Sequence, residues 1–185
     1  MNIINYMDKH LEIEYKILVN ESQFYELLKD YPNLKFIKQT NYYYDNINND
    51  LRNNKIAMRI RDKGELIYTL KNPCEHGVEE YECIVNSNDP KIFDEEPIKS
   101  VLNKFNINGP FICLGALVTY RAMYICDDYE LCFDINEYNN YKDYEIEYEY
   151  KREHDGLTNF NQILSKVNLT YKRNCASKIK RCLHL

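Results

Sequence analysis

Three charged side chains near the N-terminus alternate strictly with apolar ones: Glu12, Glu14 and Lys16, in a segment, 11–19, that otherwise has the composition of a β-strand. Successive side chains of a strand point to opposite faces, so these three are expected on one face. Two carboxylates beside an ammonium suit an oxygen-ligated divalent cation next to an anionic ligand. A strand with one solvated face shows the same alternation. The segment alone is therefore compatible with both a cation-binding site and a strand with one solvated face.

Basic side chains recur at the same spacing along the chain. Arg59 and Arg61 share one face of an expected strand, and Lys71 and Arg121 each share a face with a threonine. Arginine binds phosphate oxygens through two parallel N–H groups, and lysine acts as a point charge. One wall of such side chains could hold a chain of phosphates: Lys16, Arg59, Arg61, Lys71, Arg121 and Lys178.

Carboxylates follow the same alternation. Glu80 shares a face with Glu82, and Glu145, Glu147 and Glu149 form a row opposite aromatic and aliphatic residues. A second wall could hold Mg²⁺ or Mn²⁺, which favour carboxylate and water oxygens: Glu12, Glu14, Glu80, Asp134, Glu145 and Glu147. The two walls together outline a metal-assisted phosphoryl-transfer site. The sequence contains no G-x-x-x-x-G-K-[ST], so it does not predict a P-loop enzyme.

These side chains must be positioned by many short strands. Period-two runs predict strands at 11–19, 35–45, 55–62, 65–73, 78–85, 112–126, 129–136 and 143–151. Helical patterns are fewer, at 21–31, within 89–106, at 158–167 and at 174–183. The pattern favours a mainly β, α+β fold, an antiparallel barrel or strongly curved sheet with flanking helices, formed as one domain over 1–185.

The alternation leaves two arrangements open. An ordinary barrel would bury its aliphatic and aromatic residues and expose the charges to solvent. The inverse arrangement lines the interior with the charges and covers the apolar outer face with helices 21–31 and 158–167. We favour the inverse arrangement, because several faces carry Arg, Lys and Glu segregated by sign, and because the helices need an apolar surface to pack on.

Composition limits the classes of function. The 24 Lys and Arg against 29 Asp and Glu give a net charge of −5, which argues against general nucleic-acid binding. The seven cysteines show no C-x-x-C pair, and with no signal peptide they favour reduced thiols in the cytoplasm. No apolar run approaches the length of a membrane span.

The ordered set of motifs resembles one family. Glu12-x-Glu14-x-Lys16, Tyr43-Tyr44-Asp45, Arg59-x-Arg61, Thr69-Leu70-Lys71, Glu80, Thr119-x-Arg121, Asp134, Glu145-x-Glu147 and Ser177-Lys178 follow one another as in the CYTH superfamily. Its members, the triphosphate tunnel metalloenzymes, include inorganic, thiamine and RNA triphosphatases and class IV adenylyl cyclases. The resemblance runs from residue 11 to 181 and is closest to small single-domain bacterial members.

The resemblance implies an eight-stranded antiparallel tunnel with a charged lumen that holds the triphosphate. Glu12, Glu14, Glu145 and Glu147 would bind metal, supported by Glu80 and Asp134. Lys16, Arg59, Arg61, Lys71, Arg121 and Lys178 would hold phosphates, with Arg181 as an addition from the last helix. Tyr43 would line the tunnel or pack.

The resulting expectation is a metal-dependent triphosphatase that uses Mg²⁺ or Mn²⁺, with inorganic triphosphate as the first substrate to test. Glu12, Glu14, Lys71 and Arg121 are the expected catalytic group, and the general base is left open. The alternatives are adenylate cyclisation, thiamine triphosphate hydrolysis, a non-catalytic regulator that binds polyphosphate or nucleotide, and a structural barrel. The expected partner is a small molecule that carries a triphosphate, without nucleic acid or membrane, and the chain could form a homodimer.

Overall fold

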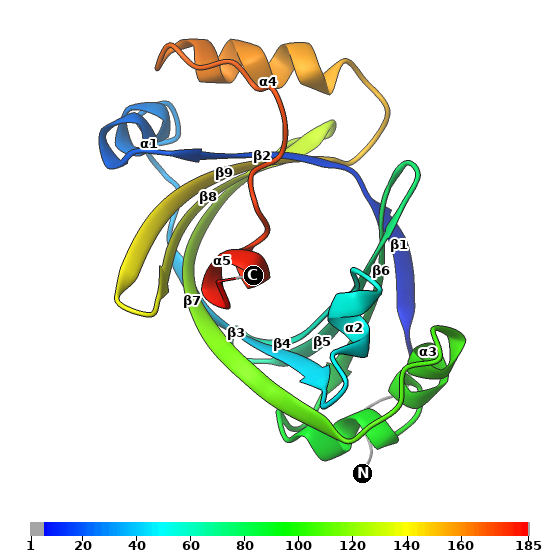
Figure 1. Cartoon of the computed structure of the whole chain (residues 1–185). Helices are drawn as coiled ribbons and strands as arrows, with labels where there is room; N and C mark the ends of the chain where they lie inside the picture. The colour runs from blue at the N-terminus through cyan, green and yellow to red at the C-terminus, as the bar shows by residue number, and fades with distance from the viewer. Residues whose placement is uncertain (1–5, 185) are drawn as a thin grey trace. The chain divides into compact units, whose positions relative to one another are not determined.

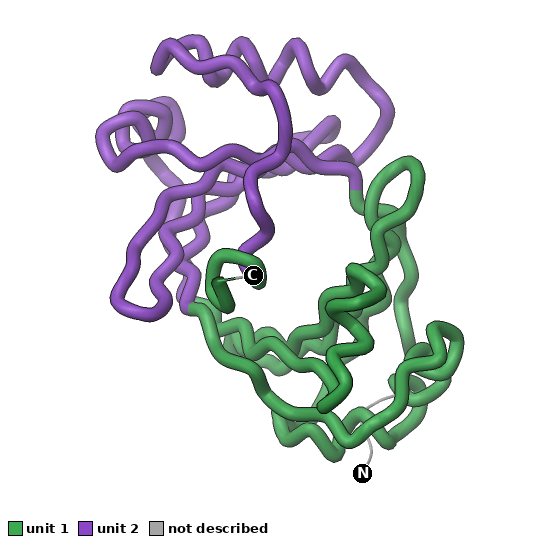
Figure 2. Tube along the Cα trace, viewed as in Figure 1, with its two compact units in different colours: residues 1–12, 39–117, 179–185 green, residues 13–38, 118–178 purple. Residues whose placement is uncertain are grey.

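The computed structural model describes residues 6–184 and is mainly β, with nine strands and a few short helices. Its contacts divide the chain into two compact units (Figure 2). Unit 1 comprises residues 1–12, 39–117 and 179–185, and unit 2 comprises residues 13–38 and 118–178. Each unit is built on an antiparallel sheet with helices against it, so the expected fold class is confirmed.

The sheet of unit 1 has the strand order β1-β6-β5-β4-β3. All its pairings are antiparallel, and the strands are β1 (Asp8–Glu12), β3 (Ile37–Asn46), β4 (Ala57–Asp62), β5 (Leu66–Cys74) and β6 (Gly77–Val85). The short loops that join β4 to β5 and β5 to β6 allow only neighbouring antiparallel pairing. The hairpin expected around Asp62-Lys63-Gly64 is present, with Gly64 at a φ of 95°.

The core of unit 1 lies on one face of this sheet. Met58, Ile60, Tyr68 and Leu70 have no exposed surface. They pack with residues of the 3₁₀ helix η1 (Pro90–Asp94), of α3 (Ile98–Lys104) and of α2 (Asp50–Asn53). The strand residues between them, which include Arg59, therefore point to the opposite face.

The sheet of unit 2 has the strand order β7-β8-β9-β2. Its strands are β2 (Glu14–Val19), β7 (Phe111–Ile125, which begins in unit 1), β8 (Tyr129–Tyr138) and β9 (Tyr141–Tyr150). Helices α1 (Glu21–Leu28) and α4 (Gly156–Ser165) lie on the same side of β9 (Figure 1). The last helix, α5 (Lys178–Cys182), begins at the last residue of unit 2 and continues into unit 1.

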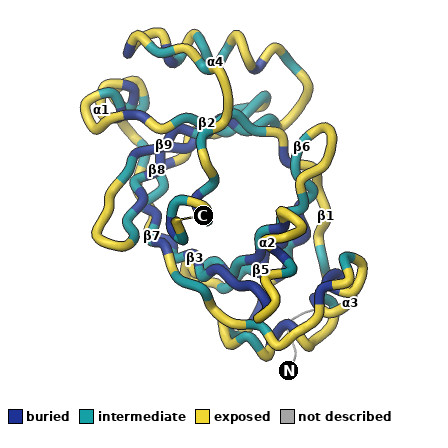
Figure 3. The backbone as a smooth tube through the Cα atoms, in the orientation of Figure 1, coloured by how far each residue is buried: buried dark blue, intermediate teal, exposed yellow. Residues whose placement is uncertain are grey.

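Helices α1 and α4 cover the apolar face of this second sheet. Phe24 of α1 and Phe160 of α4 have no exposed surface and belong to one cluster with Phe133, Ile146 and Tyr148 of the strands. Figure 3 shows buried positions along both helices interrupted by exposed ones, as expected for helices that pack by one face. The expected capping box of α1 is present, because Asn20 and Gln23 bond reciprocally to each other's backbone N–H.

The structure differs from the expected elements in three places. The single strand expected at 11–19 is two strands, because β1 pairs with β6 while β2 pairs with β9, and Ile13 lies between them. The strand count is therefore nine and not eight, and Glu12 does not share a strand with Glu14. The helix expected within 89–106 is divided into η1 and α3, and α2 was not expected.

The two arrangements that alternation left open are decided within each unit. Helices cover the apolar faces, so those faces form the cores, and the rows of Arg, Lys and Glu lie on the opposite faces. Several of these charged residues are nevertheless buried, among them Glu12, Glu80, Asp134, Glu145 and Lys178. The charges are therefore not a solvated surface.

Candidate functional site

In unit 2, a lysine lies among three carboxylates. Nζ of Lys178 is 2.9 Å from Oδ2 of Asp134, 2.6 Å from Oε2 of Glu145 and 2.6 Å from Oε1 of Glu147. The antiparallel register of β8 with β9 places Asp134 opposite Glu145, and Glu147 is two residues further along the same face. We call these four residues, with Arg121, the Lys178 cluster.

Arg121 supplies the second cation of the cluster. It stands opposite Asp134 in the register of β7 with β8. Its Nε donates to Oδ1 of Asp134 at 2.7 Å and its Nη2 to Oδ2 at 2.6 Å, and Nη2 also contacts Glu147. This two-pronged contact orients the guanidinium as a lysine could not.

The charges of the cluster hold one another ionised. Burial raises the pKa of Glu147, but Lys178, Arg121 and Lys16 outweigh it and hold that pKa well below its ordinary value. Burial also raises the pKa of Asp134, and the nearby cations again lower it. The Lys178 pKa is raised well above its ordinary value, because the three carboxylates outweigh the effect of burial. Ionised carboxylates and a charged lysine are therefore the resting state.

The N-terminal pair of unit 2 is beside this cluster in the sheet. Glu14 and Lys16 share one face of β2 and form an ion pair. Lys16 stands opposite Glu147 in the register of β2 with β9, and Glu14 stands opposite Glu149. Unit 2 therefore brings together seven of the expected site residues on one face: Glu14, Lys16, Arg121, Asp134, Glu145, Glu147 and Lys178.

Unit 1 holds a second, smaller group of charges. Nζ of Lys71 lies 2.7 Å from Oε2 of Glu12 and also contacts Glu80, which stands opposite Lys71 in the β5–β6 register. Glu12 is 8 % exposed and Glu80 is 4 % exposed. We call these three residues the Lys71 cluster.

Two carboxylates compete for the single ammonium of the Lys71 cluster. Burial raises the pKa of Glu12, and Glu80 raises it further, while Lys71 only partly opposes this. Burial also raises the pKa of Glu80, but Lys71, a hydrogen bond with Glu12 and the charge of Arg59 together outweigh it, so that pKa is lowered. The pair is thus short of positive charge, which a bound cation would supply.

Arg59 and Arg61 are the next residues along this charged face. Arg59 stands opposite Thr69 on β5 and Tyr43 on β3, and Arg61 stands opposite Asn41. Nε of Arg61 donates to Oδ1 of Asn41 at 3.0 Å. Arg181, the remaining predicted phosphate ligand, lies on α5 and is half-buried.

Asp45 of the Tyr43-Tyr44-Asp45 motif has a structural role. Its Oδ1 accepts from the backbone N–H of Leu51 at 3.0 Å and its Oδ2 accepts from that of Arg52 at 3.0 Å, so it fixes the start of α2. Tyr44 lies in the core of unit 1. Tyr43 is 3 % exposed. It stands opposite Arg59 in the register of β3 with β4, so the two side chains share the charged face.

Asn136 and Asp143, which are not among the predicted site residues, extend the Lys178 cluster through hydrogen bonds. Thr119 donates to Oδ1 of Asn136 at 2.7 Å, and Nδ2 of Asn136 donates to Asp143 at 2.9 Å and to Glu145 at 3.3 Å. The signal was present, because Asn136 and Asp143 are each two residues from a predicted ligand and so share its face.

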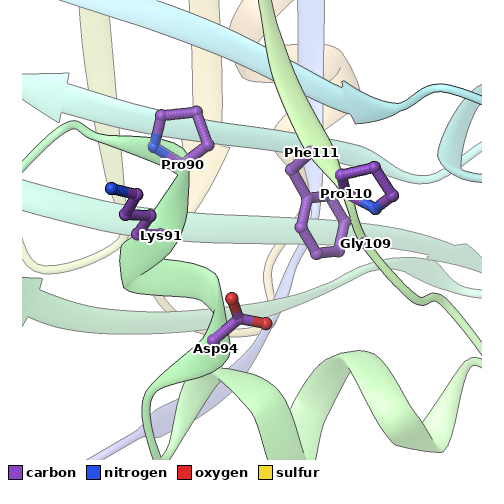
Figure 4. Close-up of a pocket in the computed structure, with 6 residues that line it drawn as sticks. All are labelled: Pro90, Lys91, Asp94, Gly109, Pro110 and Phe111. Carbon is purple, nitrogen blue, oxygen red and sulfur yellow. The ribbon is translucent and has the colours of Figure 1, made fainter.

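The structure also has a pocket of about 400 Å³ in unit 1, shown in Figure 4. One side carries Lys91 and Asp94 of η1, and the other is formed by the segment before and at the start of β7. Its lining residues are Pro90, Lys91, Asp94, Gly109, Pro110 and Phe111. None of them belongs to the predicted site, so we place the candidate chemistry at the charged faces.

The donor set of unit 2 fits a divalent cation. Asp134, Glu145 and Glu147 each offer a carboxylate oxygen, and these atoms lie within 4.8 Å of one another. Hard cations such as Mg²⁺ and Mn²⁺ prefer such oxygens. The Lys178 ammonium already satisfies the same three carboxylates, so the cluster is built to hold positive charge.

Comparison with known proteins gives the family. The model of the CYTH domain matches residues 10–183, nearly the whole chain. The chain belongs to the CYTH family. A relative in Bacillus subtilis, "Putative triphosphatase YjbK", is 30% identical over 182 residues, which cover 95% of each protein.

The names of solved structures with a similar fold mention two activities, adenylate cyclase and triphosphatase. A "putative adenylate cyclase" from Bacillus halodurans is 27% identical, with a TM-score of 0.83 over 94% of this chain and 97% of that one. A Hippeastrum protein, HpAC1, described as a putative adenylyl cyclase with a dominant triphosphatase activity, is 23% identical, with a TM-score of 0.73 over 91% and 92% of the two chains. The CYTH fold is therefore shown, and the names of the relatives do not agree on one reaction. No helix within residues 6–184 is long and apolar enough to cross a membrane.

Proposed function

We propose that this CYTH protein is a metal-dependent triphosphatase that releases phosphate from a small triphosphate, with inorganic triphosphate as the first candidate. The observation that carries the proposal is the Lys178 cluster, in which three buried carboxylates and two cations meet on one sheet face. Such a set can hold a divalent cation and phosphate oxygens next to each other. A purely structural sheet has no need of buried charges at this density.

Separate residues would hold the metal and the phosphates. Carboxylates are the proposed ligands of Mg²⁺ or Mn²⁺: Asp134, Glu145, Glu147 and Glu14 in unit 2, and Glu12 and Glu80 in unit 1. The cations are the proposed phosphate ligands: Lys16, Arg121 and Lys178 in unit 2, and Arg59, Arg61, Lys71 and Arg181 in unit 1. A bound metal would neutralise phosphate charge and lower the pKa of a bound water.

The protein's own cations would stabilise the charge that develops during phosphoryl transfer. Arg121 is held in place by two hydrogen bonds that its guanidinium donates to Asp134, so it requires little reorganisation when it meets a phosphate. The ammonium of Lys178 helps to keep the carboxylates of Asp134 and Glu147 ionised before substrate arrives. Glu12, Glu14, Lys71 and Arg121 are the side chains that we propose to touch the reacting groups, with one carboxylate orienting the attacking water.

The test is phosphate release by the purified protein from inorganic triphosphate, ATP and thiamine triphosphate, each with Mg²⁺, Mn²⁺ or EDTA. We expect release from one of them that requires metal. Glu14→Ala and Arg59→Ala should abolish it while leaving the thermal unfolding cooperative. Glu26→Ala and Arg152→Ala remove exposed charges and serve as matched controls.

Full activity of Glu14→Ala or Arg59→Ala would refute the assignment of those residues. Release that is unchanged in EDTA would refute the metal requirement. Tight binding of triphosphate without any release would instead favour a regulatory binding protein.

Adenylate cyclisation is the second candidate, because the Bacillus halodurans protein named as a putative adenylate cyclase is 27% identical over nearly the whole chain. Cyclisation of ATP yields cyclic AMP and pyrophosphate, whereas hydrolysis yields phosphate. The same ATP reactions, analysed for cyclic AMP, separate the two activities. Cyclic AMP as the main product would replace our first proposal.

A further inference from the structure

Three nitrogen donors on the charged face of unit 1 are buried and have no hydrogen-bond partner among residues 6–184. They are Nε2 of Gln39, Nδ2 of Asn41 and Nε of Arg59. Gln39 is 6 % exposed and Asn41 has no exposed surface. A donor that loses water on folding without gaining an acceptor destabilises the fold, and such groups are rare in native proteins.

The orientation of the Asn41 amide is set by its neighbour. Nε of Arg61 donates to Oδ1 of Asn41 at 3.0 Å, and this contact identifies the oxygen end of the amide. Asn41 therefore offers only its Nδ2 donor to a ligand. Gln39 is two residues away on β3 and leaves the same face, as does Arg59 on the neighbouring strand. The three donors thus form one row, which we call the donor row.

The strand register places the donor row along the sheet. Lys71 stands opposite Ala57, and Arg59 and Arg61 follow on β4 at intervals of two residues. Asn41 stands opposite Arg61, so it is about 13 Å along the strands from the level of Lys71, at 3.3 Å per residue. Gln39 is one interval further. Amide side chains are short, so Gln39 and Asn41 cannot reach back toward Lys71. They would therefore contact the end of a ligand that lies away from Lys71.

We propose that Gln39 and Asn41, together with Arg59, bind oxygen atoms of the phosphoryl group that lies furthest from Lys71 in a bound triphosphate. The inference rests on the proposed function and deepens it, because it makes the donor row the part of the protein that requires a third phosphate. Phosphoryl oxygens are acceptors only, as the row demands. A nucleobase edge, which presents donors and acceptors together, would match it less well.

The test uses Gln39→Met, which removes the amide at nearly constant size, and Asn41→Asp, which keeps the oxygen that Arg61 contacts. Gln162→Met, on the exposed side of α4, is the matched control. Calorimetry with Mg²⁺ measures binding of imidotriphosphate and imidodiphosphate, in which NH bridges prevent hydrolysis. We expect affinity for the triphosphate analogue to fall about tenfold to hundredfold in both variants, while that for the diphosphate analogue is unchanged.

A second readout separates binding from a structural role. Because the Gln39 donor has no partner in the part of the chain that the structure describes, Gln39→Met should leave the melting temperature of the ligand-free protein unchanged or raise it. A lower melting temperature with unchanged affinity would overturn the inference, as would equal losses for both analogues. A loss confined to triphosphates that carry an organic group would also overturn it, because the row would then contact that group.

The experiment distinguishes this inference from the proposed function. If the wild-type protein binds the triphosphate analogue and the variants lose that binding, the inference holds even when no substrate is hydrolysed. If the wild-type protein hydrolyses triphosphate and the variants bind the analogue as it does, the inference alone fails.

Discussion

Nζ of Lys178 lies 2.6 Å from Oε2 of Glu145, a carboxylate without exposed surface. Lys178 is the first residue of α5, and Glu145 is in the middle of β9, so the contact joins segments more than thirty positions apart in the chain. Because Asp134 and Glu147 share the same ammonium, the lysine provides the positive charge that the buried carboxylates need.

Replacement of Lys178 should weaken the fold in a way that metal can reverse. Lys178→Met leaves three carboxylates without their shared cation, and we expect a loss of about 3–5 kcal/mol in the free energy of unfolding in EDTA. Mn²⁺ should then raise the melting temperature of the variant more than that of the wild-type protein. Urea and thermal unfolding, each with EDTA or Mn²⁺, provide the measurement.

Two further variants control the Lys178 experiment. Lys178→Arg keeps the charge and should lose less stability, and Lys172→Met removes an exposed lysine. If Mn²⁺ stabilises Lys178→Met no more than the wild-type protein, the three carboxylates do not form a metal site.

The shape of the Arg121 side chain should matter as much as its charge. Arg121→Lys retains the charge but loses the two-pronged contact with Asp134. We expect kcat for phosphate release to fall about 100-fold, the scale for removal of a preorganised transition-state donor. Steady-state kinetics on the preferred substrate measure this, with Arg152→Lys as the matched surface change. A kcat within twofold of the wild-type value would show that Arg121 needs only its charge.

Acid should destabilise the metal-free protein through the Lys178 cluster. The pKa of Glu147 is well below its ordinary value of about 4.3 in the folded state, so the unfolded chain binds the proton more readily. This contribution to stability is complete above about pH 5 and is lost as the pH falls through the folded-state pKa. Urea unfolding in EDTA between pH 7 and pH 3 should show the decline.

The variant Glu147→Gln tests whether this carboxylate is responsible. It should be less stable than the wild-type protein at pH 7 and show a shallower decline on acidification. Glu153→Gln changes an exposed carboxylate and should follow the wild-type curve. Parallel curves for Glu147→Gln and the wild-type protein would assign the acid sensitivity to other groups.

We expect the buried Tyr68 hydroxyl to destabilise the fold. Tyr68 has no exposed surface, and its oxygen is buried without a hydrogen-bond partner among the described residues. Tyr68→Phe removes this unpaired group, so we expect the free energy of unfolding to rise by about 1 kcal/mol. Tyr44→Phe is the matched control, because its hydroxyl donates to the backbone oxygen of Asn88 at 2.6 Å, and it should lower stability by about 1 kcal/mol. Urea unfolding measures the free energy of unfolding of both variants. A loss of stability in Tyr68→Phe would indicate that the hydroxyl has a partner.

Local patterns predicted most of the secondary structure. Seven of the strands begin and end within a few residues of the expected runs, and Asn20 and Gln23 form the expected capping box. Strand patterns are readable because side chains alternate faces whatever the partner strand is. The division at Ile13 was not readable, because the alternation of Glu12, Glu14 and Lys16 continues through it while the pairing partner changes from β6 to β9.

The sequence by itself determined which charged residues share a face in each strand, since period two depends only on the backbone. It also determined the family, through the order of the motifs. Only the tertiary structure decided which face is buried, because that depends on where η1, α3, α1 and α4 pack. It alone brought Lys178 to Asp134, Glu145 and Glu147, because strand register and the return of the chain after α4 set those distances. The amide nitrogens of Gln39 and Asn41, which have no hydrogen-bond partner among the described residues, likewise became visible only there, because an absent partner is a property of packing and has no pattern in the sequence.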